Sequence, residues 1–101
     1  MTKTQSDGSE FKIVRTYSAG VFLGKIVRRD GKEVEMVEAR RLWYWDGAAS
    51  LSQLAMTGTT EPLRCKFPAP VDRVVLTEAI EILDVTDAAK ASIDAVPVWK
   101  R

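Results

Sequence analysis

The sequence predicts an α+β domain: a small, strongly curled antiparallel β-sheet, resembling an SH3- or Sm-like partial barrel, with two short helices. Three observations predict this class. Several segments of about five to eight residues are rich in alternating or β-branched side chains. An Asp30-Gly31 pair separates two of them, which is a strong signal for a tight β-hairpin. Only two stretches have the apolar spacing and the flanking residues of helices.

The first half of the chain contains the predicted sheet strands. Residues 1–9 are polar and are expected to form a flexible lead-in, followed by a single globular domain at 10–101. Strands are predicted at 11–17 and 21–29, with a turn at Gly20 between them. A third strand runs from Glu33 to Trp45. Its alternation slips by one residue, which predicts a β-bulge near Met36–Val37.

The second half contains both predicted helices. Asp46 is expected to cap a helix at about 47–56 that ends at Gly58. A short strand at 63–67 and strands at 72–76 and 79–85 follow, the latter two either separate or one bent strand. A second helix is predicted at about 87–95, capped by Thr86 or Asp84 and ended by Pro97. Trp99 is placed to hold the C-terminal tail against the domain.

Composition excludes several classes of protein. Fifteen basic and 14 acidic side chains give a net charge of +1, which argues against a duplex-DNA binder. With Cys65 as its one cysteine and with no histidine, the chain has neither an internal disulfide nor a Cys/His zinc site. No apolar run reaches the roughly 18 residues of a membrane span. We therefore expect a cytoplasmic protein without a metal, a cofactor or a membrane anchor.

No pattern in the sequence supports catalysis. The run from Gly20 to Lys25 has three residues between its glycines, whereas a phosphate-binding loop needs four. Glu33, Glu35 and Glu38 are expected to form a solvated face, screened by basic side chains across the hairpin. Cys65 is expected to be a small buried hydrophobe. We expect no catalytic residue and no enzymatic activity.

The strongest candidate site is the stretch of arginines and aromatic residues at 40–45. Arginine binds phosphate through two parallel hydrogen bonds, and aromatic faces stack on nucleobases. The predicted bulge places Arg41, Trp43 and Trp45 on one face of the strand and the intervening residues on the other. The alternative is that the tryptophans fill the core and Arg41 pairs with an acidic neighbour. The candidate ligand-binding residues are Arg15, Arg40, Arg41, Trp43, Trp45, Ser50 and Gln53.

Two runs of the sequence resemble a family of small phage and prophage proteins, long labelled as a domain of unknown function. They are VRTYSAGV at 14–21 and ARRLWYWDGAASLSQLA at 39–55. Further matching stretches lie at 65–67, 79–82 and 96–99, so the resemblance covers nearly all of the chain after residue 10. The chain is also similar to the Thoeris anti-defence "sponges". That resemblance implies sequestration of a cyclic nucleotide-derived immune signal without cleavage.

These observations lead to two expectations about function. The first is a non-enzymatic phage anti-defence protein in the host cytoplasm that binds a nucleotide-derived signal, of the cyclic nucleotide or cyclic ADP-ribose type. It would act as a homo-oligomer, either a dimer or a larger assembly such as a hexamer. The second is a small β-barrel interaction module that binds RNA or inhibits a host protein through the same aromatic and basic stretch.

Overall fold

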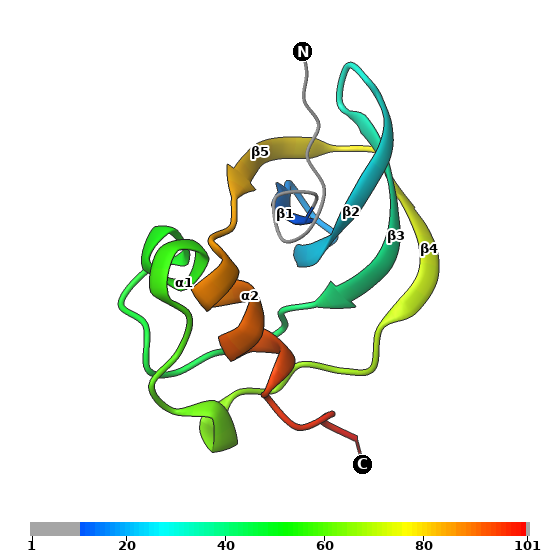
Figure 1. The fold of residues 1–101 in the computed structure, drawn as a ribbon. Helices are drawn as coiled ribbons and strands as arrows, with labels where there is room; N and C mark the ends of the chain where they lie inside the picture. The colour runs from blue at the N-terminus through cyan, green and yellow to red at the C-terminus, as the bar shows by residue number, and fades with distance from the viewer. Residues whose placement is uncertain (1–10, 101) are drawn as a thin grey trace.

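A computed structural model gives the positions of residues 11–100. Five strands form one antiparallel sheet in the order β4-β3-β2-β1-β5, and two helices lie together on one side of it (Figure 1). The expected lead-in at 1–9 lies outside the described residues. The elements are β1 (Phe11–Thr16), β2 (Val21–Asp30), β3 (Glu33–Arg41), α1 (Leu51–Thr57), β4 (Val71–Leu76), β5 (Ala79–Asp84) and α2 (Asp87–Asp94).

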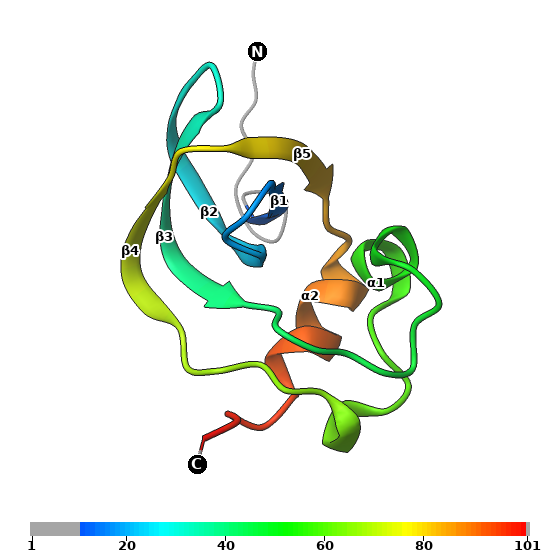
Figure 2. The same cartoon turned by 180° about the vertical axis from the view of Figure 1, so that it is seen from behind.

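The predicted hairpin is confirmed. Strands β2 and β3 pair up to Asp30 and Glu33, and Gly31 between them has a positive φ of 60°. The sheet is open, because β4 pairs only with β3 and β5 pairs only with β1. Two residues, 77 and 78, nevertheless connect these two edge strands, and β5 crosses the end of the sheet next to the β2–β3 hairpin (Figure 2). The strands predicted at 72–76 and 79–85 are therefore separate.

The β-bulge in β3 lies at Glu38, one residue beyond the predicted Met36–Val37 pair. Leu23 pairs with Arg40 and Lys25 pairs with Val37, so β3 contains one more residue than β2 over this interval. Glu38 and Ala39 thus lie opposite the single residue Gly24. Glu38 has a φ of 51°, in the left-handed region. This bulge changes which side chains face each side of the sheet. Before it Met36 is buried on one face, and after it Arg40 and Leu42 are buried on the other.

The expectation that this strand continues to Trp45 is wrong. Strand β3 ends at Arg41, because its partner β2 begins at Val21, whose carbonyl accepts the last hydrogen bond, from Leu42 N. Beyond this point the chain pairs with a different segment. Tyr44 and Lys66 form an isolated antiparallel bridge. The strand expected at 63–67 is instead a short 3₁₀ helix at Pro62–Arg64, followed by this bridge.

The first helix begins later than expected, and Asp46 does not cap it. The cap is Ser50, whose Oγ accepts a hydrogen bond from Gln53 N, and Gly58 ends the helix at a φ of 77° as predicted. Asp46 instead accepts a hydrogen bond from Gly47 N and pairs with Arg64. The sequence signal was ambiguous because Asp and Ser are both good caps.

The second helix agrees closely with its prediction. Thr86 caps it by accepting a hydrogen bond from Ala89 N, and the helix ends at Asp94, before Pro97. Thr86 also donates to Met56 O, which connects the start of α2 to the end of α1. Neither helix of the described chain is long and apolar enough to cross a bilayer.

Each face of the sheet contributes side chains to a separate buried apolar cluster. Neighbours on one strand divide between them: Ile13 contributes to the cluster under the helices, and Val14 to the cluster on the opposite face. Phe67 and Cys65 belong to the helix-side cluster, so the expected role of Cys65 as a buried hydrophobe is confirmed. This burial fixes the orientation of side chains at the end of β3, where the candidate site begins.

Candidate functional site

An open groove lies where β3 ends beside the turn between β1 and β2. Its volume is about 480 Å³, within the range of small-molecule sites. It contains three of the predicted ligand-binding residues, Arg41, Trp43 and Trp45. The remaining lining residues are Ser18, Ala19, Gly20, Val21 and Leu42.

Arg41 brings a positive charge to this groove. Its guanidinium lies over the ring of Phe22, with 4.5 Å between the guanidinium carbon and the ring centroid. The acidic neighbours expected to neutralise it have other partners: Glu38 pairs with Lys25 at 3.5 Å, and Asp46 with Arg64 at 3.1 Å. Within residues 11–100, Arg41 has no ion pair, so its charge is available to an anion.

The two tryptophans of the groove differ in burial. The Trp43 side chain is 58% exposed, although it is large and apolar. Trp45 is half-buried and packs against the helix-side core. The alternative that the tryptophans fill the core therefore applies in part to Trp45 and not to Trp43.

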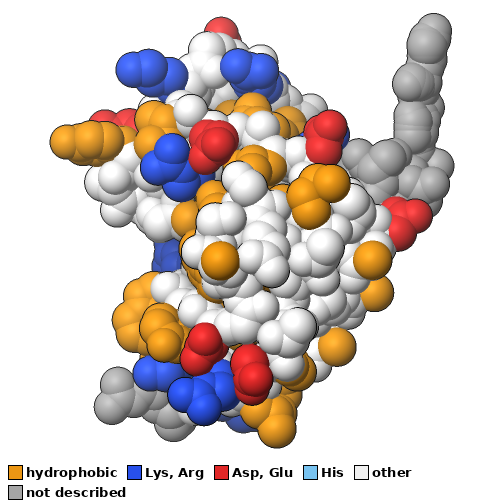
Figure 3. Space-filling model, turned by 90° about the vertical axis from the view of Figure 1, so that its left-hand side faces the viewer, with side chains coloured by type: hydrophobic (Ala, Val, Ile, Leu, Met, Phe, Trp, Pro, Cys, Tyr) orange, Lys and Arg blue, Asp and Glu red, His pale blue; other side chains and the backbone are white. Residues whose placement is uncertain are grey.

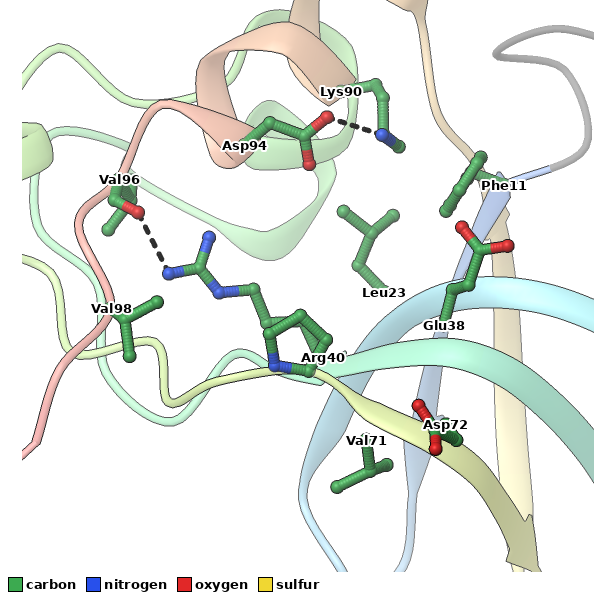
Figure 4. A pocket seen from close by; sticks show the side chains of 11 residues that line it. Phe11, Leu23, Glu38, Arg40, Val71, Asp72, Lys90, Asp94, Val96 and Val98 are labelled. Atoms are coloured by element: carbon green, nitrogen blue, oxygen red, sulfur yellow. Dashed lines mark hydrogen bonds and ion pairs between the residues drawn. The ribbon is translucent and has the colours of Figure 1, made fainter.

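Arg40, which was expected to bind ligand, is a buried structural residue. Strand alternation turns its side chain under the helices, away from Arg41, and it is 7% exposed. Its guanidinium donates to five backbone carbonyl oxygens, at Phe67, Pro68, Ile93, Val96 and Pro97. Figure 4 shows it pointing toward the carbonyl of Val96. Burial lowers the pKa of Arg40, and an Asp94 charge opposes that shift. Arg40 is therefore not part of the candidate site, and its predicted role in ligand binding is wrong.

The other three candidates also lie outside the groove. Arg15 pairs with Glu81 of the neighbouring strand at 2.8 Å. Ser50 accepts from Gln53 N, and Gln53 Oε1 accepts from Ala49 N, so both side chains satisfy the start of α1. That helix end consequently does not offer these donors to an anion.

A second cavity of about 380 Å³ lies between α2 and the sheet (Figure 4). Most of its charged groups have partners: Lys90 pairs with Asp94, Glu38 with Lys25, and Arg40 with carbonyl oxygens. The remaining charged group in the lining is the carboxylate of Asp72, which repels an anion. The rest of its lining is largely apolar, including Phe11, Leu23 and Val96. The charges of this cavity stabilise the fold, and it is a weaker candidate for an anionic ligand.

The acidic residues of β3 form ion pairs, as expected for a screened surface. Arg28 contacts both Glu33 and Glu35, and Arg73 contacts Glu35 at 2.6 Å. Hydrogen bonds from Arg73 and then Arg28 hold the pKa of Glu35 below its ordinary value. No group of three acidic or cysteine side chains within the described part of the chain is arranged to hold a metal ion.

The chain matches one known protein family. A family described as a domain of unknown function, DUF6948, matches residues 10–93. The chain belongs to the DUF6948 family. Neither the curated proteins nor the solved structures contain a match to it. The matched range includes every strand and nearly all of α2, so the groove lies within the family domain.

In this DUF6948 chain, two residues near Trp43 were not among the residues predicted to bind ligand, Lys66 and Trp99. Lys66 lies over the rings of Trp43, Tyr44 and Trp99, and Trp99 stacks on Trp43, although these residues come from three separate segments of the chain. Trp99 was expected only to hold the C-terminal tail against the domain, and no ligand-binding role was predicted for Lys66. Long-range pairing brings them together, and no local periodicity signals it. Their isolated aromatic and basic character was the one clue in the sequence.

Proposed function

We propose that the chain is a non-enzymatic phage anti-defence protein. In this proposal it binds a nucleotide-derived immune signal, of the cyclic nucleotide or cyclic ADP-ribose type, and holds it without cleavage. The phage context and the sponge-like activity rest on the resemblance of the central run ARRLWYWDGAASLSQLA. Sequestration requires tight binding and no general base, which suits a chain without histidine.

The observation that carries the proposal is the position of Arg41. A guanidinium without an acidic partner in the described chain lies beside two tryptophans in an open groove. Arginine is suited to phosphate because its donors match the spacing of phosphate oxygens. The exposed ring of Trp43 offers a π-face on which a base can stack. Phosphate and base together describe a nucleotide.

Two further features belong to the proposal. The first is a partial barrel of the SH3 or Sm type, supported by the β4-β3-β2-β1-β5 order and by the two-residue link between the edge strands. The second is a homo-oligomer in the host cytoplasm, from a dimer up to a hexamer. Association would bury the exposed apolar side chains of Leu63 and Val98.

A second candidate function is an interaction module that binds RNA or a host protein. It is supported by the exposed aromatic rings of Trp43 and Tyr44. The distribution of charge argues against the binding of a long polynucleotide. On the side of the molecule that carries α1, charged side chains gather at the two ends and leave a mainly neutral middle (Figure 3). A continuous basic track, typical of polynucleotide binders, is missing from this face.

Titration with a panel of nucleotides, followed by tryptophan fluorescence, tests the proposal. We expect one nucleotide to bind tightly and to be recovered intact by mass spectrometry after denaturation. Arg41→Ala should weaken its binding about tenfold to a hundredfold, because charge-assisted hydrogen bonds contribute about 1.5–3 kcal/mol.

Arg15→Ala is the matched control, because it removes an exposed strand arginine that lies outside the groove. It should leave the affinity unchanged. If no nucleotide in the panel binds more tightly than about 100 μM, or if the bound nucleotide is recovered cleaved, the proposal fails.

A further inference from the structure

Trp43 has an aromatic neighbour that is not part of the groove lining. Its ring stacks on that of Trp99, with 5.0 Å between centroids and 26° between planes. The Lys66 ammonium lies 5.8 Å from the centroids of both tryptophans and 5.6 Å from that of Tyr44. We call these four residues the aromatic platform.

Backbone hydrogen bonds hold the platform in place. Tyr44 and Lys66 exchange two of them, from Tyr44 N to Lys66 O at 3.3 Å and from Lys66 N to Tyr44 O at 2.8 Å. Trp99 N donates to Phe67 O at 3.0 Å. Since Phe67 is fully buried, this second segment is anchored in the core. These hydrogen bonds fix the backbone segments from which the side chains of Tyr44, Lys66 and Trp99 project.

The platform borders a second recess. This recess has a volume of about 220 Å³ and is lined by Trp99 together with Pro62, Leu63, Cys65, Pro97 and Val98. Trp43 lines the larger groove, and Trp99, stacked on it, lines the recess. One ring of the stacked tryptophan pair thus lines the groove, and the other lines the smaller recess.

Two cations without an acidic partner among residues 11–100 lie near the tryptophan pair. Arg41 lines the groove together with Trp43, and Lys66 lies over the rings of both tryptophans. Several other basic side chains form ion pairs, as Arg64 does with Asp46. Two separated positive charges and two sets of π-faces are complementary to a ligand with two phosphates and two bases.

We infer that the ligand is a dinucleotide, with one base and phosphate at Arg41 and Trp43 and the second at Lys66 and Trp99. This inference rests on the proposed function and names its ligand class. A mononucleotide would leave the platform side empty. A long polynucleotide would need more cations than these two along its path.

A length series of adenine nucleotides tests the inference: AMP, the 5′-phosphorylated dinucleotide pApA, and the corresponding hexanucleotide. We expect pApA to bind about tenfold or more tightly than AMP, since it gains one stacked base and one phosphate contact. The hexanucleotide should gain little beyond that. Binding is followed by calorimetry, so that the signal does not depend on the tryptophans.

Variants of the platform separate its two sides. Lys66→Met keeps the side-chain stem and the backbone bridge but removes the charge. It should lower the affinity for pApA toward that for AMP and leave AMP binding unchanged. Trp99→Leu should act in the same direction by removing a π-face. Lys100→Met, an exposed lysine for which no ring contact is described, is the control and should change neither affinity.

Three outcomes would overturn the inference. Equal affinities for AMP and pApA, both reduced by Arg41→Ala, would reject the dinucleotide and leave the proposed function standing. An affinity that keeps rising with length, with a salt dependence steeper than two phosphate contacts produce, would indicate a polynucleotide site. The absence of binding by AMP, pApA and the wider nucleotide panel would reject the proposed function as well.

Discussion

Two adjacent arginines show how one residue position decides between structure and binding. Arg40 and Arg41 have the same chemistry, but strand alternation points them to opposite faces. Arg40 ends beneath α2, where its charge meets the carbonyl of Ile93 near the C-terminal end of that helix. Helix C-termini present unsatisfied carbonyls and a partial negative charge, which a buried guanidinium can satisfy. Within the described residues, the Arg41 guanidinium lies over the ring of Phe22 and has no ion pair, so its charge remains available.

Replacing each arginine by lysine should separate these roles. Arg40→Lys keeps the charge but loses the planar fork that reaches five carbonyls, so the free energy of unfolding should fall by about 3 kcal/mol or more. Arg41→Lys should change it by less than about 0.5 kcal/mol, as expected for an exposed site. Urea denaturation followed by circular dichroism measures both. Equal losses in the two variants would contradict the structural role of Arg40.

At the scale of elements, the sequence predicted those features that depend on neighbouring residues. The Asp-Gly hairpin, the Gly58 helix end and the Thr86 cap each rest on contacts within a few positions, and all three are found. The bulge was expected because of the doubled apolar pair at Met36–Val37. The bulge lies at Glu38 instead, because its position is set by the register in which β3 pairs with β2. Opposite the bulge, Gly24 allows the two backbones to approach closely.

Gly24→Ala should destabilise the domain. A Cβ at this position would lie 2.9 Å from Ala39 Cα and 3.0 Å from Val37 O, both backbone atoms that cannot turn aside. The expected loss is about 1–3 kcal/mol in the free energy of unfolding, as for overpacking elsewhere. Gly31→Asn is the control: nothing lies within 4 Å of its Cβ position, and asparagine tolerates the positive φ. Thermal unfolding that ranks the two variants in the opposite order would contradict this account of the bulge.

At the scale of the whole molecule, the contacts that complete the site join distant segments. Arg40 binds carbonyls 53 to 57 positions away in α2 and the tail, and Trp43 stacks on Trp99. Composition and periodicity describe local neighbourhoods, so they indicated aromatic and basic character without identifying these partners. Arg41, Trp43 and Trp45 were predictable as a group because they lie two positions apart on one segment. Lys66 and Trp99 were not, because their contacts with Trp43 and Tyr44 depend on the tertiary fold.

Ion pairs between neighbouring strands predict how the stability of the domain changes at acidic pH. Glu35 of β3 accepts hydrogen bonds from Arg73 of β4 and Arg28 of β2, and these hold its pKa below 4.5, its ordinary value. Because the folded pKa is the lower one, the unfolded chain binds more protons between the two values. The stabilisation by Glu35 is therefore complete above 4.5 and is lost as the pH falls through the folded pKa.

Glu35→Gln should lower the free energy of unfolding at neutral pH, and the difference from the native chain should shrink as the pH falls below 4.5. Denaturation at a series of pH values on both sides of that point measures the effect. Glu61→Gln is the matched control, because no ion pair is described for its exposed carboxylate, and it should follow the native chain throughout. A difference for Glu35→Gln that stays constant with pH would mean that the three-strand ion pair does not contribute to stability. The acid limit of the sheet would then depend on other carboxylates, such as those paired with Lys12 and Arg15 at its β5 edge.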